Sequence, residues 1–326
     1  MRATAISHPN IALIKYWGKR DGGANLPAVG SLSITLSGMS SRTTVAFDAA
    51  RDRDEVLLNG KSDATTAARV SECLDVLRHR AGVRHGARVT STNDFPTGAG
   101  LASSASGFAA LAVAANAALG LELPQAALTD VARLGSGSAP RSLFGGFALL
   151  ENQSDGGVRC GPWLEASAWP LRVLVAITKA GPKETSSRDG MAQSRTTSPL
   201  YAEWVRSHPA DLERGKALVH SRDFMALAEL AEHNCLKMHA VMLTTQPPLL
   251  YWEPATVECM QVVRELRAKG TAVFYTIDAG PQLKAVCLPG AVEQVRAALA
   301  AVPGVTSIID CALGAGARVV VDGVDG

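Results

Sequence analysis

The alternation of apolar and polar residues in the first half of the chain predicts a sheet interleaved with helices. Runs rich in β-branched residues predict strands at 3–7, 33–36, 42–47, 87–91 and 171–178. Apolar residues at helical spacing predict helices at 65–79 and 123–134. The stretch 101–119 is almost entirely apolar, so it predicts a helix that is buried on all sides. Residues 181–198 are polar and rich in turn-forming residues, which predicts a loop.

Helical spacing dominates from Pro199 onward, and strands return near the end of the chain. The predicted helices are 200–207, 212–219, 224–242, 256–269 and 291–301. The predicted strands are 273–277, 283–288 and two short ones near 307–309 and 317–321. This order of elements predicts an α+β protein with two domains, at residues 1–182 and 183–326.

Length and composition are typical of a compact enzyme. The 326 residues are enough for two domains of about 150 residues each. Hydrophobic residues make up 47% of the chain and charged residues 19%, so a sizeable core can form without a disulfide or a metal. The 32 basic and 30 acidic residues give a net charge of +2, without a block of five like charges. Charge therefore favours neither nucleic acid nor a membrane surface as a partner.

The cysteines and the N-terminus favour a cytoplasmic location. The six cysteines are scattered, without a CxxC pair or zinc-ligand spacing, so we expect buried, inert thiols. His8, Pro9 and Asn10 interrupt the apolar core that a signal peptide needs. The uncharged stretch 95–121 contains Pro96 and several glycines and serines. A glycine-rich loop before a buried helix explains this stretch better than a membrane span.

The stretch 96–107, PTGAGLASSASG, is the first candidate site, because it opens the predicted buried helix. Its small residues leave backbone N–H groups free to bind an anion at a helix N-terminus. The spacing matches neither GxxxxGK[ST] nor GxGxxG. A glycine-rich turn that only permits close helix packing is the alternative, but the paired Ser103 and Ser104 favour phosphate or magnesium binding.

The stretch 135–142, GSGSAPRS, is a second polar cluster. Ser136, Ser138 and Arg141 could together hold an anion, since a guanidinium pairs with a carboxylate or phosphate through two parallel hydrogen bonds. The alternative is the end of a helix that carries a surface arginine.

Two charged residues lie in apolar surroundings. Lys15 is flanked by Ile14 and Tyr16, and a lysine there is difficult to solvate without an anionic partner. Asp278 ends an apolar strand just before a Gly-Pro turn, a position that could hold a catalytic carboxylate on a rigid scaffold. It could equally cap that turn.

Taken together, these segments resemble the diphosphomevalonate decarboxylase family of the GHMP kinase superfamily. The motifs that carry the resemblance are, in order, NIALIKYWGKR, FPTGAGLASSASGFAAL, LGSGSAPRSLFGG, SSRDGM and YTIDAGP, and they span essentially the whole chain. The resemblance implies an S5-type N-terminal ATP-binding domain and a ferredoxin-like C-terminal domain, with the active site between them. It also implies ATP-dependent decarboxylation of mevalonate 5-diphosphate to isopentenyl diphosphate, with ATP as co-substrate and Mg²⁺ as cofactor.

The resemblance further implies roles for individual residues. Asp278 would act as the base or orienting group for the 3-hydroxyl, beside Lys15, and Arg141 would hold the substrate carboxylate. The remaining substrate-binding residues would be Tyr16, Lys19, Ser136, Ser138 and Arg188, of which Tyr16, Lys19 and Arg188 would hold the 5-diphosphate. The ATP-binding residues would be Gly98, Ala99, Gly100, Leu101, Ala102, Ser103 and Ser104, with Ser104 nearest the γ-phosphate or its magnesium. The sequence identifies no carboxylate pair as metal ligands.

One loop departs from the family pattern, which leaves substrate preference open. Where the family has Leu-Pro-x-Asn-Ser-Ser or a close variant, this chain has LPAVGS, so Val29 and Gly30 replace a polar pair. If that loop lines the cleft, it loses hydrogen bonds to the ligand. The alternatives are a decarboxylase of mevalonate 5-phosphate, a kinase that stops at the 3-hydroxyl, or a non-catalytic nucleotide-binding relative. Homodimers are common in the family, so a homodimer is one expectation.

Overall fold

The computed structural model describes residues 1–20, 25–96, 100–179, 181 and 183–320. Within these residues, the first sheet has the strand order β13-β1-β4-β6-β5, with β5 and β6 parallel and the other neighbours antiparallel. Its strands are β1 (Arg2–Ser7), β4 (Ser41–Asp48), β5 (Glu55–Leu58), β6 (Gly86–Asn93) and β13 (Arg318–Val319).

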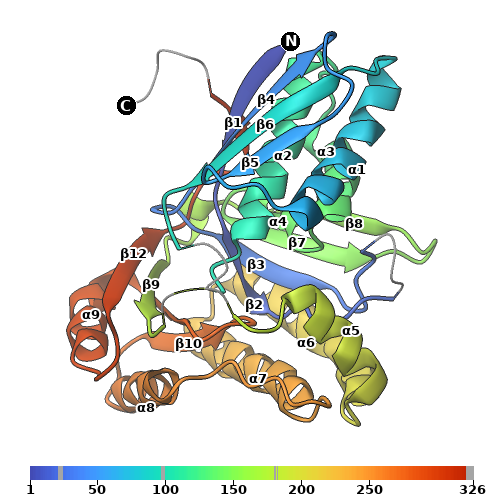
Figure 1. Cartoon of the computed structure of the whole chain (residues 1–326). Helices are drawn as coiled ribbons and strands as arrows, with labels where there is room; N and C mark the ends of the chain where they lie inside the picture. Colours follow the sequence, from blue (N-terminus) through green and yellow to red (C-terminus); the bar gives the residue numbers. More distant parts are fainter. Residues whose placement is uncertain (21–24, 97–99, 180, 182, 321–326) are drawn as a thin grey trace.

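The helices α1 (Ala64–Ala81) and α2 (Ser103–Ala118) lie on one face of this sheet, and α3 (Gln125–Gly135) packs against both helices (Figure 1). The α1 helix begins where the Asp63 carboxylate accepts a hydrogen bond from the Thr66 N–H, and it ends at Gly82 in the left-handed conformation. Along α2 the small and apolar side chains are buried nearly all round, as its uncharged sequence predicts. This part of the core therefore fixes the N-terminus of α2, where the phosphate loop was expected.

A second sheet, in the order β2-β3-β7-β8, lies at the centre of the molecule (Figure 1). Its strands are β2 (Asn10–Ile14), β3 (Ser31–Thr35), β7 (Phe147–Asn152) and β8 (Val158–Leu164), and the short helix α4 (Ala139–Ser142) precedes β7. The helices α6 (Tyr201–Ser221) and α7 (Phe224–Leu243) pack against β2. Their apolar side chains share one core with this sheet, so the chain just after β2 runs through the centre of the protein.

The third sheet is antiparallel, in the order β10-β11-β9-β12. Its strands are β9 (Arg172–Ile177), β10 (Val273–Ile277), β11 (Leu283–Cys287) and β12 (Ser307–Ala312). The helices α8 (Pro254–Ala268) and α9 (Val292–Ala300) pack on it, and short 3-10 turns cover Ala166–Ala168 and Pro289–Ala291. The Thr276 hydroxyl of β10 donates to the Ala12 carbonyl of β2 at 3.2 Å, which links the third sheet to the second.

Two sequence predictions were wrong in the central region. Residues 181–198 are not all loop, because Ser187–Thr197 form helix α5, capped by the Ser186 hydroxyl. Only Gly190, Met191 and Ser194 of α5 are buried, so apolar spacing could not reveal it. The helices predicted at 200–207 and 212–219 are one helix, α6, which continues through Pro209.

Strand pairing connects the two predicted domains, because a strand from each side of residue 182 belongs to a sheet on the other side. β9 precedes residue 182 but pairs with β11 and β12, while β13 follows it but pairs with β1. The division into 1–182 and 183–326 stays a prediction. Within the described residues, no helix combines the length and the apolar character that crossing a membrane requires.

Candidate active site

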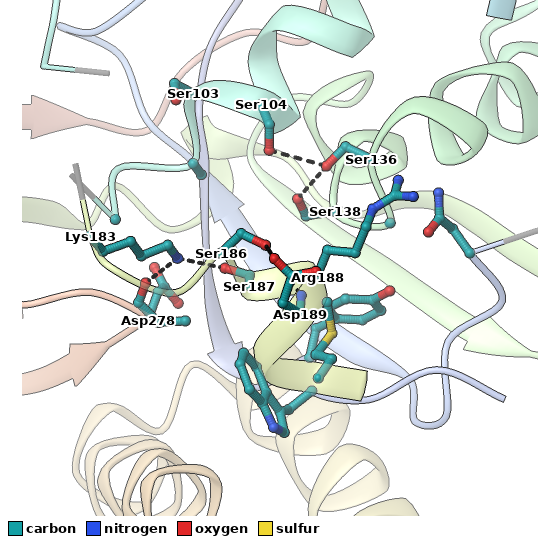
Figure 2. A pocket seen from close by; sticks show the side chains of 18 of the residues that line it. Ser103, Ser104, Ser136, Ser138, Lys183, Ser186, Ser187, Arg188, Asp189 and Asp278 are labelled. Carbon is teal, nitrogen blue, oxygen red and sulfur yellow. Dashed lines mark hydrogen bonds between the residues drawn. The ribbon is translucent and has the colours of Figure 1, made fainter. Parts of the chain in front are cut away.

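A cleft of about 660 Å³ is lined by residues from both halves of the chain. Its walls come from the chain after β2, the N-termini of α1, α2 and α5, the segment from α3 to α4, and the turn after β10. Figure 2 shows serines of α2 and of the α3–α4 segment on one side, opposite Lys183, Asp278 and the start of α5. Among the described lining residues, the basic side chains are Lys19, Arg69, Arg141, Lys183 and Arg188, and the acidic ones are Asp63, Asp189 and Asp278.

Asp278 lies between two buried lysines. The Lys15 ammonium donates a hydrogen bond of 2.7 Å to Asp278 Oδ1, and Lys284 Nζ lies 3.4 Å from Oδ2. Both lysine side chains are 1% exposed, while the Asp278 side chain is a quarter exposed. The expectation that Lys15 needs an anionic partner is confirmed, and the carboxylate faces lysines instead of capping the turn.

Opposing effects act on the pKa of Asp278. Burial alone would raise the pKa of the carboxyl, but the nearby charges of Lys15, Lys284 and Arg141 outweigh it and hold the pKa well below its usual range. The Oδ2 atom is buried and accepts no hydrogen bond within the described part of the chain. Asp278 is therefore an ionised carboxylate whose partly exposed side chain lines the cleft, with Lys284 beside its buried Oδ2 atom.

The expected ATP loop lies beside this carboxylate. Gly98 and Ala99 fall outside the described residues, whereas Gly100, Leu101 and Ala102 line the cleft with Ser103 and Ser104. Gly100 has a φ of +79°, and a Cβ atom there would meet the Gly280 Cα at 2.8 Å. Only glycine fits this approach between the loop and the turn that follows Asp278.

The hydroxyls of three serines are linked by hydrogen bonds along the wall of the cleft. Ser136 Oγ lies 3.2 Å from Ser104 Oγ and 3.2 Å from Ser138 Oγ (Figure 2). The two sequence clusters at 96–107 and 135–142 thus come together, at the point where α2 begins. The N-terminus of a helix favours a negative ligand at this position.

Arg141 is buried in the wall of the cleft, which excludes the alternative of a surface arginine. Its side chain donates from Nη1 to Ser31 Oγ at 2.7 Å, and Nε has no hydrogen-bond partner in the described residues. Its guanidinium carbon lies 5.5 Å from the centre of the Tyr16 ring. Burial raises the pKa of Tyr16 to about 12, although Arg141 opposes this, so Tyr16 offers a neutral phenol. Gly137 permits this packing, because a Cβ atom there would overlap Tyr16 Oη.

The residues expected to hold a diphosphate lie on the same cleft. Lys19 Nζ donates to Asn25 Oδ1 at 2.5 Å, and the buried Asn25 amide in turn donates to the Arg133 and Leu134 carbonyls. Arg188 is exposed on the first turn of α5 and lines the cleft with Tyr16 and Lys19.

The sequence analysis did not identify three basic residues, two that line the cleft and one that lies beneath it next to Asp278. Lys183 donates to Ser187 Oγ and to the Ala279 carbonyl, at 2.6 Å each, and burial lowers its pKa to about 8. Arg69 of α1 lines the cleft and donates to the Gly135 carbonyl. Lys284 is a lysine between apolar neighbours of a strand, the same signal that identified Lys15, so it could have been found.

Val29 and Gly30, which depart from the family pattern, are not among the residues that line the cleft. Val29 is 3% exposed in an apolar cluster with Trp17 and Met191. A Cβ atom on Gly30 would meet Leu212 Cδ2 at 2.5 Å. The pair thus belongs to the core, and Ser31, which follows it, orients Arg141.

The described residues contain no cluster of three histidine, cysteine or carboxylate side chains that could hold a metal. Mg²⁺ is commonly bound by few protein ligands together with substrate phosphates and waters. The hydroxyls of Ser104, Ser136 and Ser138 fit that pattern, because they offer oxygen atoms at a phosphate-binding helix terminus. All six cysteines are buried, as expected.

Comparison with known proteins gives matches over nearly the whole chain. Residues 7–160 match the family model "Diphosphomevalonate decarboxylase-like N-terminal domain", and residues 173–316 match "Mevalonate 5-diphosphate decarboxylase C-terminal domain". Diphosphomevalonate decarboxylase of Candida albicans is 37% identical over 305 residues, which cover 86% of this chain and 83% of that protein.

Solved structures match as well. One is "MDDEF in complex with MVAPP, AMPPCP and Magnesium", which is 39% identical with a TM-score of 0.90 and covers 98% of this chain and 99% of that one. Mevalonate diphosphate decarboxylase from Staphylococcus aureus is 36% identical with a TM-score of 0.91, over 98% of each chain. The GHMP-kinase-like α+β fold expected from the sequence is confirmed.

Proposed function

Because the chain belongs to the diphosphomevalonate decarboxylase family, we propose that its cleft converts mevalonate 5-diphosphate and ATP into isopentenyl diphosphate, ADP, phosphate and CO2. The protein is a decarboxylase, a carbon–carbon lyase of isoprenoid biosynthesis. The observation that carries the assignment of residues is the ionised Asp278, held between Lys15 and Lys284 at the base of a cleft with further basic side chains. Such a site suits a substrate with a carboxylate and phosphates.

Asp278 orients the 3-hydroxyl of the substrate. The low pKa of its carboxyl makes it a weak base, but the ionised carboxylate, which has Lys284 beside Oδ2, lines the cleft and can accept a hydrogen bond from the hydroxyl. Phosphoryl transfer through a loose transition state needs positioning first and proton removal late, so a weak base suffices. Lys15, on the other oxygen, keeps Asp278 ionised and offsets negative charge near the transferred phosphoryl group.

Arg141 holds the carboxylate that is lost as CO2. A tertiary hydroxyl leaves poorly, so ATP first converts it into a phosphate leaving group. As that group departs, positive charge develops on the carbon and draws electrons from the bond to the carboxylate. The guanidinium, oriented by Ser31, keeps this bond aligned, and Ser136 and Ser138 add hydroxyl donors beside it.

Tyr16, Lys19 and Arg188 bind the 5-diphosphate, since they line the cleft with donors and positive charge. Gly100 to Ser104 bind the ATP phosphates at the N-terminus of α2, with Lys183 as a further positive charge. Ser104 would hold Mg²⁺ with the nucleotide phosphates. The metal offsets phosphate charge when bound. AMPPCP is an ATP analogue, so the complex with AMPPCP and magnesium supports both ligands.

The test is incubation of the protein with ATP, Mg²⁺ and either mevalonate 5-diphosphate or mevalonate 5-phosphate, with ADP and CO2 followed separately. Release of both products with the diphosphate is the expected result. ADP without CO2 indicates a 3-hydroxyl kinase, and preference for the monophosphate indicates the other decarboxylase. We also propose a cytoplasmic homodimer that needs neither nucleic acid nor membrane, which size-exclusion chromatography with light scattering and cell fractionation would test.

A further inference from the structure

Lys284 is a fully buried lysine to which the proposed mechanism assigns no step. It lies on β11, an inner strand of the third sheet, opposite Thr276 of β10 and Val175 of β9. Its neighbours Leu283 and Ala285 are 0% exposed, and the Lys284 side chain is 1% exposed. An ammonium in such a place costs free energy unless it is paired and hydrogen-bonded.

The contacts of Lys284 join two parts of the active site. Its Nζ donates to the Gly100 carbonyl at 3.0 Å and lies 3.4 Å from Asp278 Oδ2. Gly100 belongs to the expected ATP loop, and Asp278 ends the strand next to β11. One ammonium therefore contacts the nucleotide loop and the carboxylate that orients the substrate hydroxyl.

Neutralising Asp278 does not by itself explain this lysine, because Lys15 already pairs with the same carboxylate at 2.7 Å. Burial lowers the pKa of Lys284, Asp278 counteracts this, and Lys15 adds to the lowering. An apolar side chain at this position would avoid these costs and would suit an inner strand. Lys15 does not explain the other contact of Lys284, the hydrogen bond to the Gly100 carbonyl, which reaches the nucleotide loop.

The contact with Gly100 fixes the orientation of a peptide group. In a trans peptide the carbonyl and the following N–H point in opposite directions. A carbonyl held by Lys284 therefore fixes the direction of the Leu101 N–H, two residues before α2 begins at Ser103. The close approach of Gly100 to Gly280 fixes the loop at a second point.

We propose that Lys284 is a positioning residue that links the nucleotide loop to the turn at Asp278. Through this link the ATP phosphates are held in position for phosphoryl transfer to the substrate hydroxyl. The proposal rests on the proposed function of the cleft. It requires that loss of Lys284 weakens nucleotide binding more than substrate binding. It also requires that loss of Lys284 removes part of the positive charge near Asp278 that keeps this carboxylate ionised.

The first test is binding of Mg²⁺–AMPPCP, measured by calorimetry in the presence of mevalonate 5-diphosphate. The variants are Lys284→Met, which removes charge and donor, and Lys284→Gln, which keeps an N–H donor. Lys216→Met is the matched control, because Lys216 forms ion pairs with Glu151 and Glu213 away from the cleft. We expect the Kd of AMPPCP to rise about tenfold or more in Lys284→Met, less in Lys284→Gln, and not in the control. The Kd of mevalonate 5-diphosphate should change less than about twofold.

The second test is the pH profile of kcat/KM, which a merely structural residue would not move. The groups that face Asp278 are Lys15, Lys183, Lys284, Arg141, Cys235 and His239. Removing the charge of Lys284 raises the pKa of Asp278, so the acid limb should move to higher pH in both Lys284 variants.

Wild-type affinity for AMPPCP together with an unmoved acid limb would overturn the proposal. An equal loss of affinity for both ligands would overturn it too, since that outcome means general disorder of the cleft. If Lys284→Met fails to fold, Lys284→Gln carries the same comparison. A wild-type protein that binds AMPPCP but releases no CO2 contradicts the proposed function instead, and the binding comparison still decides the role of Lys284.

Discussion

Replacing Arg141 by lysine tests the carboxylate clamp, because it keeps the charge and removes the planar fork. In the structure Nη1 donates one of its N–H groups to Ser31, so the guanidinium can still present other Nη N–H groups to a carboxylate. A lysine ammonium cannot make that parallel pair. Losing one charge-assisted hydrogen bond costs about 1.5 to 3 kcal/mol, which lowers kcat/KM roughly tenfold to a hundredfold.

The assay follows CO2 release from mevalonate 5-diphosphate at several substrate concentrations, with ADP measured in the same samples. Arg206→Lys is the matched control, since Arg206 pairs with Glu203 on the surface. Within the described residues Arg141 forms no ion pair with a carboxylate, so the Tm should stay close to that of the wild type. Near-normal CO2 release by Arg141→Lys would refute the clamp.

Three further predictions concern the same cleft. Asp278→Asn should lower turnover by about a hundredfold or more while ATP still binds, and a loss below about tenfold in single-turnover assays would exclude an essential role for the carboxylate. Lys19→Ala or Arg188→Ala should reduce the preference for 5-diphosphate over 5-phosphate by roughly tenfold to a hundredfold in kcat/KM, and unchanged preference would remove them from the diphosphate site. The pKa of Lys183 is lowered to about 8, so its charge is present below that pH and lost above it. The kcat/KM for ATP should fall as pH rises through about 8, and Lys183→Arg should abolish this basic limb, because a guanidinium stays charged.

Apolar periodicity predicted the elements that bury one clear face. The helices over 65–79 and 224–242 agree with α1 and α7 to within two residues. Periodicity failed where burial is slight or where packing overrides a local signal. The α5 helix buries little and faces the cleft, and α6 continues through Pro209 because it packs against α7 and the second sheet.

Local signals also identified most of the candidate site. The glycine-rich run and the serine cluster each indicated an anion site, and the structure joins them through Ser104, Ser136 and Ser138. No local signal could identify Arg69, because its role depends on α1 lying beside the end of α3. Such contacts arise only from tertiary packing.

The balance of charge in the site could not be predicted from separate motifs. Lys15 and Asp278 each suggested one buried charge in need of a partner, and as a pair they neutralise each other. The structure adds Lys284 to that pair, and Arg141 further lowers the pKa of Asp278. The base of the cleft therefore keeps an excess of positive charge in a largely buried place, which is costly without an anion. Substrate carboxylate and nucleotide phosphates offset this cost, so the same charges that destabilise the empty cleft give it selectivity for anionic ligands.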